Sequence, residues 1–124
     1  MALALCVAAG GKMVAIATTL FTLSWTHSVE KTEWRESWVL EHNRLRVVEA
    51  RVRGSGAGME PPEGSVLHDG WWVYRPAIPP QEKLVLARSG ATGSGWQLCV
   101  EDDCREIGGA SAGSPVVIRA CGGE

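Results

Sequence analysis

The stretch from Phe21 to Arg53 alternates apolar and polar side chains with the two-residue period of β-strands. The pattern begins at Phe21, repeats from Trp34 to Leu40, and continues less cleanly from Leu45 to Arg51. A helix would instead place apolar side chains every three to four residues, and no convincing period of that kind occurs before Gly54. We therefore expect three antiparallel strands joined by two tight turns at the centre of the fold.

Short segments of strand composition recur on both sides of this meander. Residues 3–8 and 13–17 predict a hairpin around Gly10 and Gly11. Residues 54–70 are rich in glycine and proline and predict a long irregular loop. Further strands are expected at 71–75, 83–88, 96–100, 105–107 and 116–119. The chain is thus expected to be all-β, with residues 1–124 forming a single-domain antiparallel β-sandwich or partly closed barrel of about eight to ten short strands.

The composition is that of an ordinary globular protein. Of the 124 residues, 45% are hydrophobic and 21% are charged, and the formal net charge is −2. Without a basic stripe to neutralise phosphates, nucleic acid is not an expected partner. The run around Gly56 and Gly58 lacks the strand, helix and spacing of a phosphate-binding loop, so no cofactor is expected.

The first residues are apolar, but they do not have the pattern of an export signal. No basic segment precedes the apolar run, and Gly10, Gly11 and Lys12 interrupt it. A signal sequence is therefore not evident in this chain.

Four cysteines are present, and an even number in a small β-rich chain is compatible with two disulfides formed in an oxidising compartment. Cys99 and Cys104 flank a short turn, so a hairpin would bring them opposite each other, and Cys6 and Cys121 would form the second bridge. Free buried thiols and a zinc site remain alternatives, although the spacing lacks paired C-x-x-C motifs.

The two turns of the meander set a register that can be predicted. Lys31 and Thr32 are expected at the first tip, and His42 and Asn43 at the second, where asparagine tolerates a positive φ. One sheet face would then carry the rows Leu23/Leu40/Leu45, Trp25/Trp38/Val47, His27/Glu36/Glu49 and Val29/Trp34/Arg51. A slip of one residue would move members of a row to opposite faces.

The row His27/Glu36/Glu49 is the main candidate for chemistry. Two carboxylates side by side repel each other unless a cation such as protonated histidine, Arg51 or a metal ion lies beside them. Such a row can bind a ligand or transfer protons, and its alternative interpretation is an ion-pair cluster that closes the end of the sheet. Whether a metal binds there is left open.

Other residues are weaker candidates. Ser28 beside His27 is no nucleophile–base pair, because neighbouring strand residues point to opposite faces. Trp71 and Trp72 cannot both face inward, so one of them is a candidate contact residue. The full set of candidate binding residues is His27, Ser28, Glu30, Trp34, Glu36, Glu49, Arg51, Gly56, Gly58 and Trp71.

The segments Trp25 to Thr32, Glu36, Gly56 to Pro61 and Gly70-Trp71, continuing to Cys99 and Cys104, resemble a small bacterial family known as domain of unknown function 1850. The resemblance implies an exported protein of the periplasm or cell envelope, commonly encoded beside tripartite (TRAP) transporters of the TAXI type. It implies no catalytic residues. We therefore expect a periplasmic accessory or binding module whose partner is a membrane transporter or solute-binding subunit and whose small-molecule ligand is unidentified. The alternative is a small metal-dependent or acid–base enzyme that uses the His/Glu/Glu row.

Overall fold

The computed structural model describes residues 4–26, 32–53, 63–88, 95–107 and 113–121. Eleven strands and no helix occur in these ranges. The strands are β1 (Ala4–Ala9), β2 (Lys12–Ala17), β3 (Leu20–Thr26), β4 (Glu33–Glu41), β5 (Arg44–Arg53), β6 (Val66–His68), β7 (Trp71–Tyr74), β8 (Lys83–Arg88), β9 (Trp96–Val100), β10 (Asp103–Ile107) and β11 (Gly113–Cys121).

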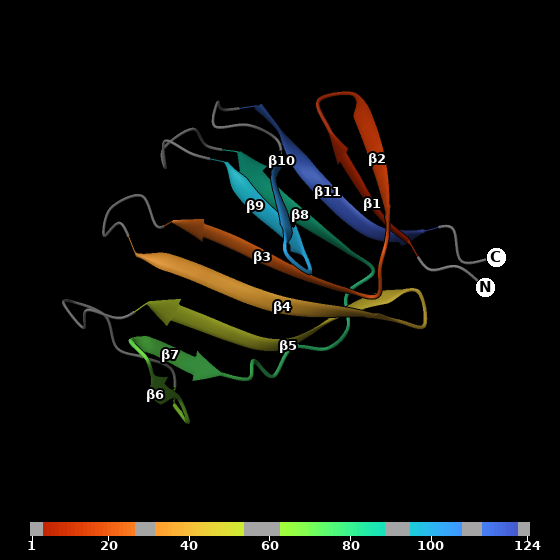
Figure 1. Cartoon of the computed structure of the whole chain (residues 1–124). Helices are drawn as coiled ribbons and strands as arrows, with labels where there is room; N and C mark the ends of the chain where they lie inside the picture. Colours follow the sequence, from red (N-terminus) through yellow and green to blue (C-terminus); the bar gives the residue numbers. More distant parts are fainter. Residues whose placement is uncertain (1–3, 27–31, 54–62, 89–94, 108–112, 122–124) are drawn as a thin grey trace.

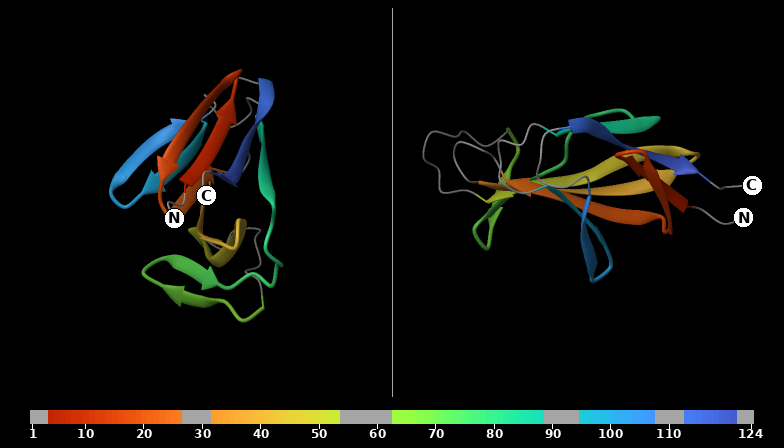
Figure 2. Two further views of the ribbon diagram at one scale, coloured as in Figure 1. Left: turned by 90° about the vertical axis from the view of Figure 1, so that its right-hand side faces the viewer. Right: turned by 90° about the horizontal axis from the view of Figure 1, so that it is seen from above.

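The strands form two antiparallel sheets that pack face to face (Figures 1 and 2). The smaller sheet has the order β2-β1-β11-β8, and the larger has the order β10-β9-β3-β4-β5-β7-β6. The predicted all-β sandwich is confirmed, and the two sheets do not close into a barrel. Strands β6 and β7 lie on the opposite side of the molecule from β1 and β2 (Figure 1).

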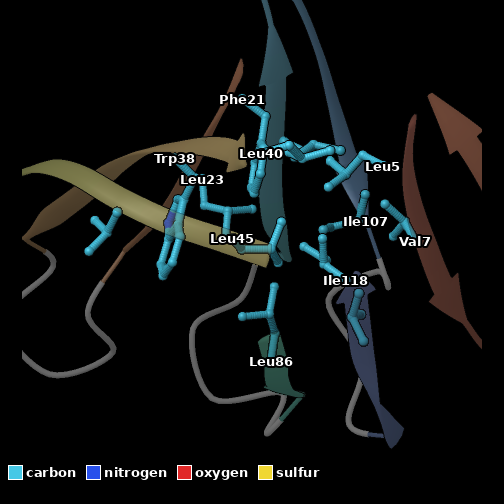
Figure 3. Packing of buried hydrophobic residues seen from close by; sticks show 13 residues of the cluster. Leu5, Val7, Phe21, Leu23, Trp38, Leu40, Leu45, Leu86, Ile107 and Ile118 are labelled. Carbon is cyan, nitrogen blue, oxygen red and sulfur yellow. The ribbon is translucent and has the colours of Figure 1, made fainter. Parts of the chain in front are cut away.

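The core lies between the two sheets. Apolar side chains of both sheets point into the same interior, among them Leu5, Leu45 and Leu86 (Figure 3). Leu5, Leu23 and Ile118 are completely buried. Such a side chain stabilises the fold by roughly 1.5–3 kcal/mol through its removal from water. The core therefore fixes which face of each strand points inward, and this assignment decides where the polar side chains go.

Two of the predicted hairpin turns are confirmed. Ala9 pairs with Lys12 around Gly10 and Gly11, both of which have positive φ. At the second turn, His42 and Asn43 adopt φ values of 54° and 62°, and Glu41 pairs with Arg44 across them. Two consecutive residues in this conformation match the twist of the flanking strands.

The predicted register between β3 and β4 is wrong by four residues. Trp25 lies opposite Trp34 rather than Trp38, and Phe21 lies opposite Trp38. The observed register stacks aromatic rings across the two strands, with the planes of Phe21 and Trp38 within 8° of each other. Lys31 and Thr32 lack the glycine or asparagine that a two-residue turn favours, and the ladder instead ends at the pair Thr26/Glu33. Because the shift is even, the inward face is unchanged.

The register between β4 and β5 is correct for half of its length. Leu40 lies opposite Leu45 and Trp38 opposite Val47, as expected. An irregularity then inserts one extra residue, Val48, so that Ser37 lies opposite Glu49. This bulge moves every later residue of β5 to the face opposite to the predicted one.

One further prediction is wrong, for residues 66–68, and one is confirmed, for the disulfides. Residues 66–68, expected within the irregular loop, form the short edge strand β6, which pairs with β7. Both disulfides are present: Cys99 pairs with Cys104 across the β9–β10 hairpin, and Cys6 pairs with Cys121 at a Cα–Cα distance of 5.9 Å. The second bridge joins β1 to β11 within the smaller sheet.

Candidate functional site

A row of tryptophans crosses the inner face of the larger sheet. Trp25 lies opposite Trp34, which lies opposite Val52, and Val52 in turn lies opposite Trp72 of β7. Trp96 of β9 completes the row, with its ring 4.7 Å from that of Trp25. We call Trp96, Trp25, Trp34 and Trp72 the tryptophan row. These side chains remain partly exposed, whereas Val52 is buried.

Trp34 occupies the middle of the tryptophan row. Its ring is stacked on Trp25, with a centroid distance of 6.0 Å and planes within 9°. Its indole Nε1 is buried, yet it has no hydrogen-bond partner among the residues that the structure describes. By contrast, Trp96 donates from its Nε1 to the carbonyl of Ala87 at 3.0 Å. An unpaired buried donor costs about 1–3 kcal/mol, so an acceptor from a bound molecule would gain that amount at Trp34.

Glu36 lies on the same inner face, one row closer to the core. It is opposite Leu23 on one side and Ala50 on the other, and Ala50 lies opposite Tyr74. Burial raises the pKa of the Glu36 carboxyl, while the hydrogen bond donated by Trp38 Nε1 at 3.1 Å opposes that rise. Burial, followed by the nearby Glu36 charge, raises the pKa of the Tyr74 hydroxyl. We call the tryptophan row together with Glu36 and Tyr74 the inner-face site.

Glu36 has no cationic partner among the residues that the structure describes. The arginines nearest to it in the chain and across the ladder, Arg35 and Arg51, lie on the other face because strand side chains alternate. A half-buried carboxylate flanked along its strand by Trp34 and Trp38 attracts a positively charged group more strongly than an exposed carboxylate does.

The outer face of the same strands carries the arginines. Arg35, Arg51 and Arg53 place their guanidinium carbons 4.9, 6.0 and 4.9 Å from the ring centre of Trp71. We call these four residues the arginine cluster. The Arg35 guanidinium donates to Glu33 at 3.0 Å, and Arg51 Nε donates to Glu49 at 3.1 Å. Two of the three positive charges are thereby balanced within the cluster's surroundings.

The predicted row of His27, Glu36 and Glu49 does not form as expected. Glu49 lies opposite Ser37, on the face opposite to Glu36, because of the bulge at Val48. His27 lies outside the described residues. Within the described ranges, no cluster of three histidine, cysteine or acidic side chains is arranged to hold a metal ion.

The other candidate residues divide between the two faces. Trp34 belongs to the inner-face site, whereas Arg51 and Trp71 belong to the arginine cluster. Ser28, Glu30, Gly56 and Gly58 lie outside the described residues. Sequence reasoning missed Tyr74 and the alignment of Trp25 and Trp96 with Trp34. The spacing of Trp72 and Tyr74, two residues apart on one strand, is the signal that points to Tyr74.

The described part of the chain contains no helix with the length and apolar character needed to cross a membrane.

Comparison with known proteins identifies one family. No curated protein and no solved structure matches the chain. The family described as Domain of unknown function (DUF1850) matches residues 21–107, well over half of the 124 residues. The match begins at Phe21 of β3 and ends at Ile107 of β10, so it includes the whole inner-face site. The chain belongs to the DUF1850 family.

Proposed function

We propose that this protein is an exported binding module, and that its inner-face site takes a ligand or partner group that combines a positive charge with apolar surface. The observation that carries the proposal is the position of Glu36, a half-buried carboxylate without an ion pair in the described structure, beside Trp34 and Tyr74. Aromatic rings attract cations through their negative faces, by about 0.5–2 kcal/mol per contact. A carboxylate of raised pKa gains further when a cation arrives, because the cation favours its charged form.

Binding is favoured over catalysis by the placement of the acidic groups. A metal-dependent or acid–base mechanism was expected to use Glu36 and Glu49 together, but these side chains lie on opposite faces of the sheet. Among the described residues, the inner-face site combines the carboxylate of Glu36, the phenol of Tyr74 and several indoles. This composition is typical of a recognition surface, in which apolar area supplies affinity and a few polar groups orient the ligand.

An exported location and a role as transporter accessory complete the proposal. The two disulfides support export, because such bonds persist in oxidising compartments. In this setting the cargo-binding subunit or membrane subunit of a tripartite transporter is the expected partner. Intact-mass measurement after alkylation without reductant, on protein taken from the native cell envelope, is expected to find no alkylated cysteine. Alkylation of both Cys99 and Cys104 would place the protein in a reducing compartment and contradict this part of the proposal.

The ligand class can be tested with tryptophan fluorescence. A panel of organic ammonium compounds, neutral sugars and carboxylic acids is titrated into the wild-type protein, and only the ammonium compounds are expected to change the emission. Glu36→Gln should weaken that response by at least about tenfold, since it removes the charge and keeps the shape. Glu49→Gln is the matched control on the outer face and should leave it unchanged. A response to sugars or acids alone, or an equal loss in both variants, would overturn the proposal.

A further inference from the structure

The edge of the smaller sheet is formed by β2, whose sequence is unusual for a free edge. Five of the six residues in KMVAIA are apolar, and the only charge is Lys12 at one end. Met13 and Val14 are 68% and 46% exposed. The strand contains no proline, and its pairing with β1 runs without a bulge from Ala4/Ala17 to Ala9/Lys12. Natural edge strands usually carry charged residues, prolines or bulges, which prevent pairing with other chains.

The other three sheet edges differ from β2, and β8 carries a charge at each end, Lys83 and Arg88. Strand β10 carries Asp103, Arg105 and Glu106, and strand β6 has only three residues. The segment leading into β8 is held by Gln81, which exchanges backbone hydrogen bonds of 2.7 and 2.8 Å with Leu45. Among the described edge strands longer than three residues, β2 therefore carries the fewest charges.

An apolar groove of about 210 Å³ opens beneath the same edge. Its floor and walls are formed by Val7, Ala9, Val14 and Ile16 of the smaller sheet and by Ile107 of β10. Lys12, Arg105 and Glu106 also line it. Figures 1 and 2 show that β2 and the β9–β10 hairpin lie at the same side of the sandwich. The groove thus lies along an edge strand that has no second neighbouring strand among the described residues.

We propose that β2 pairs antiparallel with β2 of a second copy of this chain, which extends the smaller sheet across a two-fold axis. Such an interface is self-complementary by symmetry, so the strand must tolerate its own sequence running in the opposite direction. With Val14 on the axis, Lys12 lies opposite Ile16 of the second copy and Met13 lies opposite Ala15. The two lysines are kept apart, and Met13 meets the small side chain of Ala15.

The alternative register, with Ala15 on the axis, also keeps the lysines apart. In that register Val14 lies opposite Ile16 of the second copy, so inward residues still meet inward residues. In either register the side chains of the second copy cover Val14 and extend the apolar lining of the groove. Specific interfaces bury roughly 1,200–2,000 Å², and one pair of six-residue strands is a small contact by comparison. The association is therefore expected to be reversible and to depend on concentration.

Sedimentation velocity of the purified, oxidised protein over a concentration series tests this pairing. The wild-type chain is expected to shift from monomer to dimer as concentration rises. Val14→Lys places two like charges at the axis and should raise the dissociation constant at least about tenfold. Val85→Lys is the matched control, because Val85 is a 56% exposed valine on β8, at the other edge of the same sheet; it should leave the dimer intact.

A charge-swap experiment separates a specific interface from a general loss of solubility or folding. Val14→Lys and Val14→Glu should each be monomeric. An equimolar mixture of the two should recover the dimer, because opposite charges then meet across the β2–β2 interface. Circular dichroism confirms that each variant is folded before mixing. A wild-type protein that stays monomeric throughout the series, a dimer that survives Val14→Lys, or a mixture that stays monomeric would each overturn the proposal.

Discussion

The two faces of the larger sheet are built from the same strands, and they differ in how they satisfy charge. On the outer face, three arginines surround Trp71, and glutamates balance two of them. On the inner face, one glutamate lies among indoles with hydrogen bonding from Trp38 alone among the described contacts. Alternation along each strand sends neighbouring residues, such as Arg35 and Glu36, to these two environments. Most of the charge on the outer face is paired, whereas the carboxylate on the inner face has no cationic partner among the described residues.

This difference indicates where a partner group can add free energy. A ligand at the arginine cluster must displace ion pairs that already exist and that are screened by solvent and salt. A cation at the inner-face site would meet a carboxylate whose desolvation is compensated only in part, by the hydrogen bond from Trp38. An acceptor near Trp34 would satisfy a donor that is now unpaired.

The largest expected difference between the faces concerns two tryptophans. Trp38 is 6% exposed and stacked on Phe21, so Trp38→Ala should reduce the free energy of unfolding by about 3–5 kcal/mol. Trp71→Ala on the outer face should cost about 1–2 kcal/mol, because it removes partly exposed cation–π contacts. Urea denaturation under non-reducing conditions measures both. Equal losses of unfolding free energy in the two variants would contradict the expected difference between the two faces.

A second prediction concerns the unpaired donor of Trp34. Trp34→Phe keeps most of the ring stacking on Trp25 and removes the buried N–H. We expect a change in the free energy of unfolding within about 1 kcal/mol, since the lost area and the relieved donor offset each other. Trp96→Phe is the control, and it should cost more because Trp96 donates to Ala87. A larger loss for Trp34 than for Trp96 would show that Trp34 already has an acceptor.

The smallest effects come from the two glutamates, and they should have opposite signs. Glu49→Gln should cost less than about 1 kcal/mol, and the cost should shrink as salt is added, because the Arg51–Glu49 pair is partly exposed. Glu36→Gln should stabilise the protein at neutral pH by less than about 1 kcal/mol, because it removes a partly buried charge.

The raised pKa of Glu36 determines how its contribution to stability changes with pH. Because its folded-state pKa is raised, the folded protein holds the proton more tightly than the unfolded chain does. Wild-type stability due to this group is therefore full below the unfolded pKa and is lost as pH rises through the folded pKa. The advantage of Glu36→Gln should vanish in acid and grow toward neutral pH. Thermal unfolding of both proteins across this range is the measurement, and a constant difference would contradict the prediction.

The sequence was sufficient for the fold class and for the inward faces of β3 and β4, and insufficient for the second half of β5 and for the site. Alternation in β3 and β4 identified Trp38, Leu40 and Leu23 as core residues, and the four-residue shift left that assignment intact. The bulge at Val48 had no visible signal, because no glycine or proline marks it, yet it alone separates Glu49 from Glu36. The alternation of side chains along a strand predicts the face of each residue only as far as the first inserted residue.

The central claim is that Glu36 is a half-buried carboxylate that lacks a compensating charge. The direct test is an NMR titration of the side-chain carboxyl carbons, with the Glu36 signal assigned by its absence in Glu36→Gln. The account predicts a Glu36 midpoint above the ordinary glutamate pKa of 4.5. A midpoint at or below 4.5 would show that a cationic group already compensates Glu36 and would contradict the account.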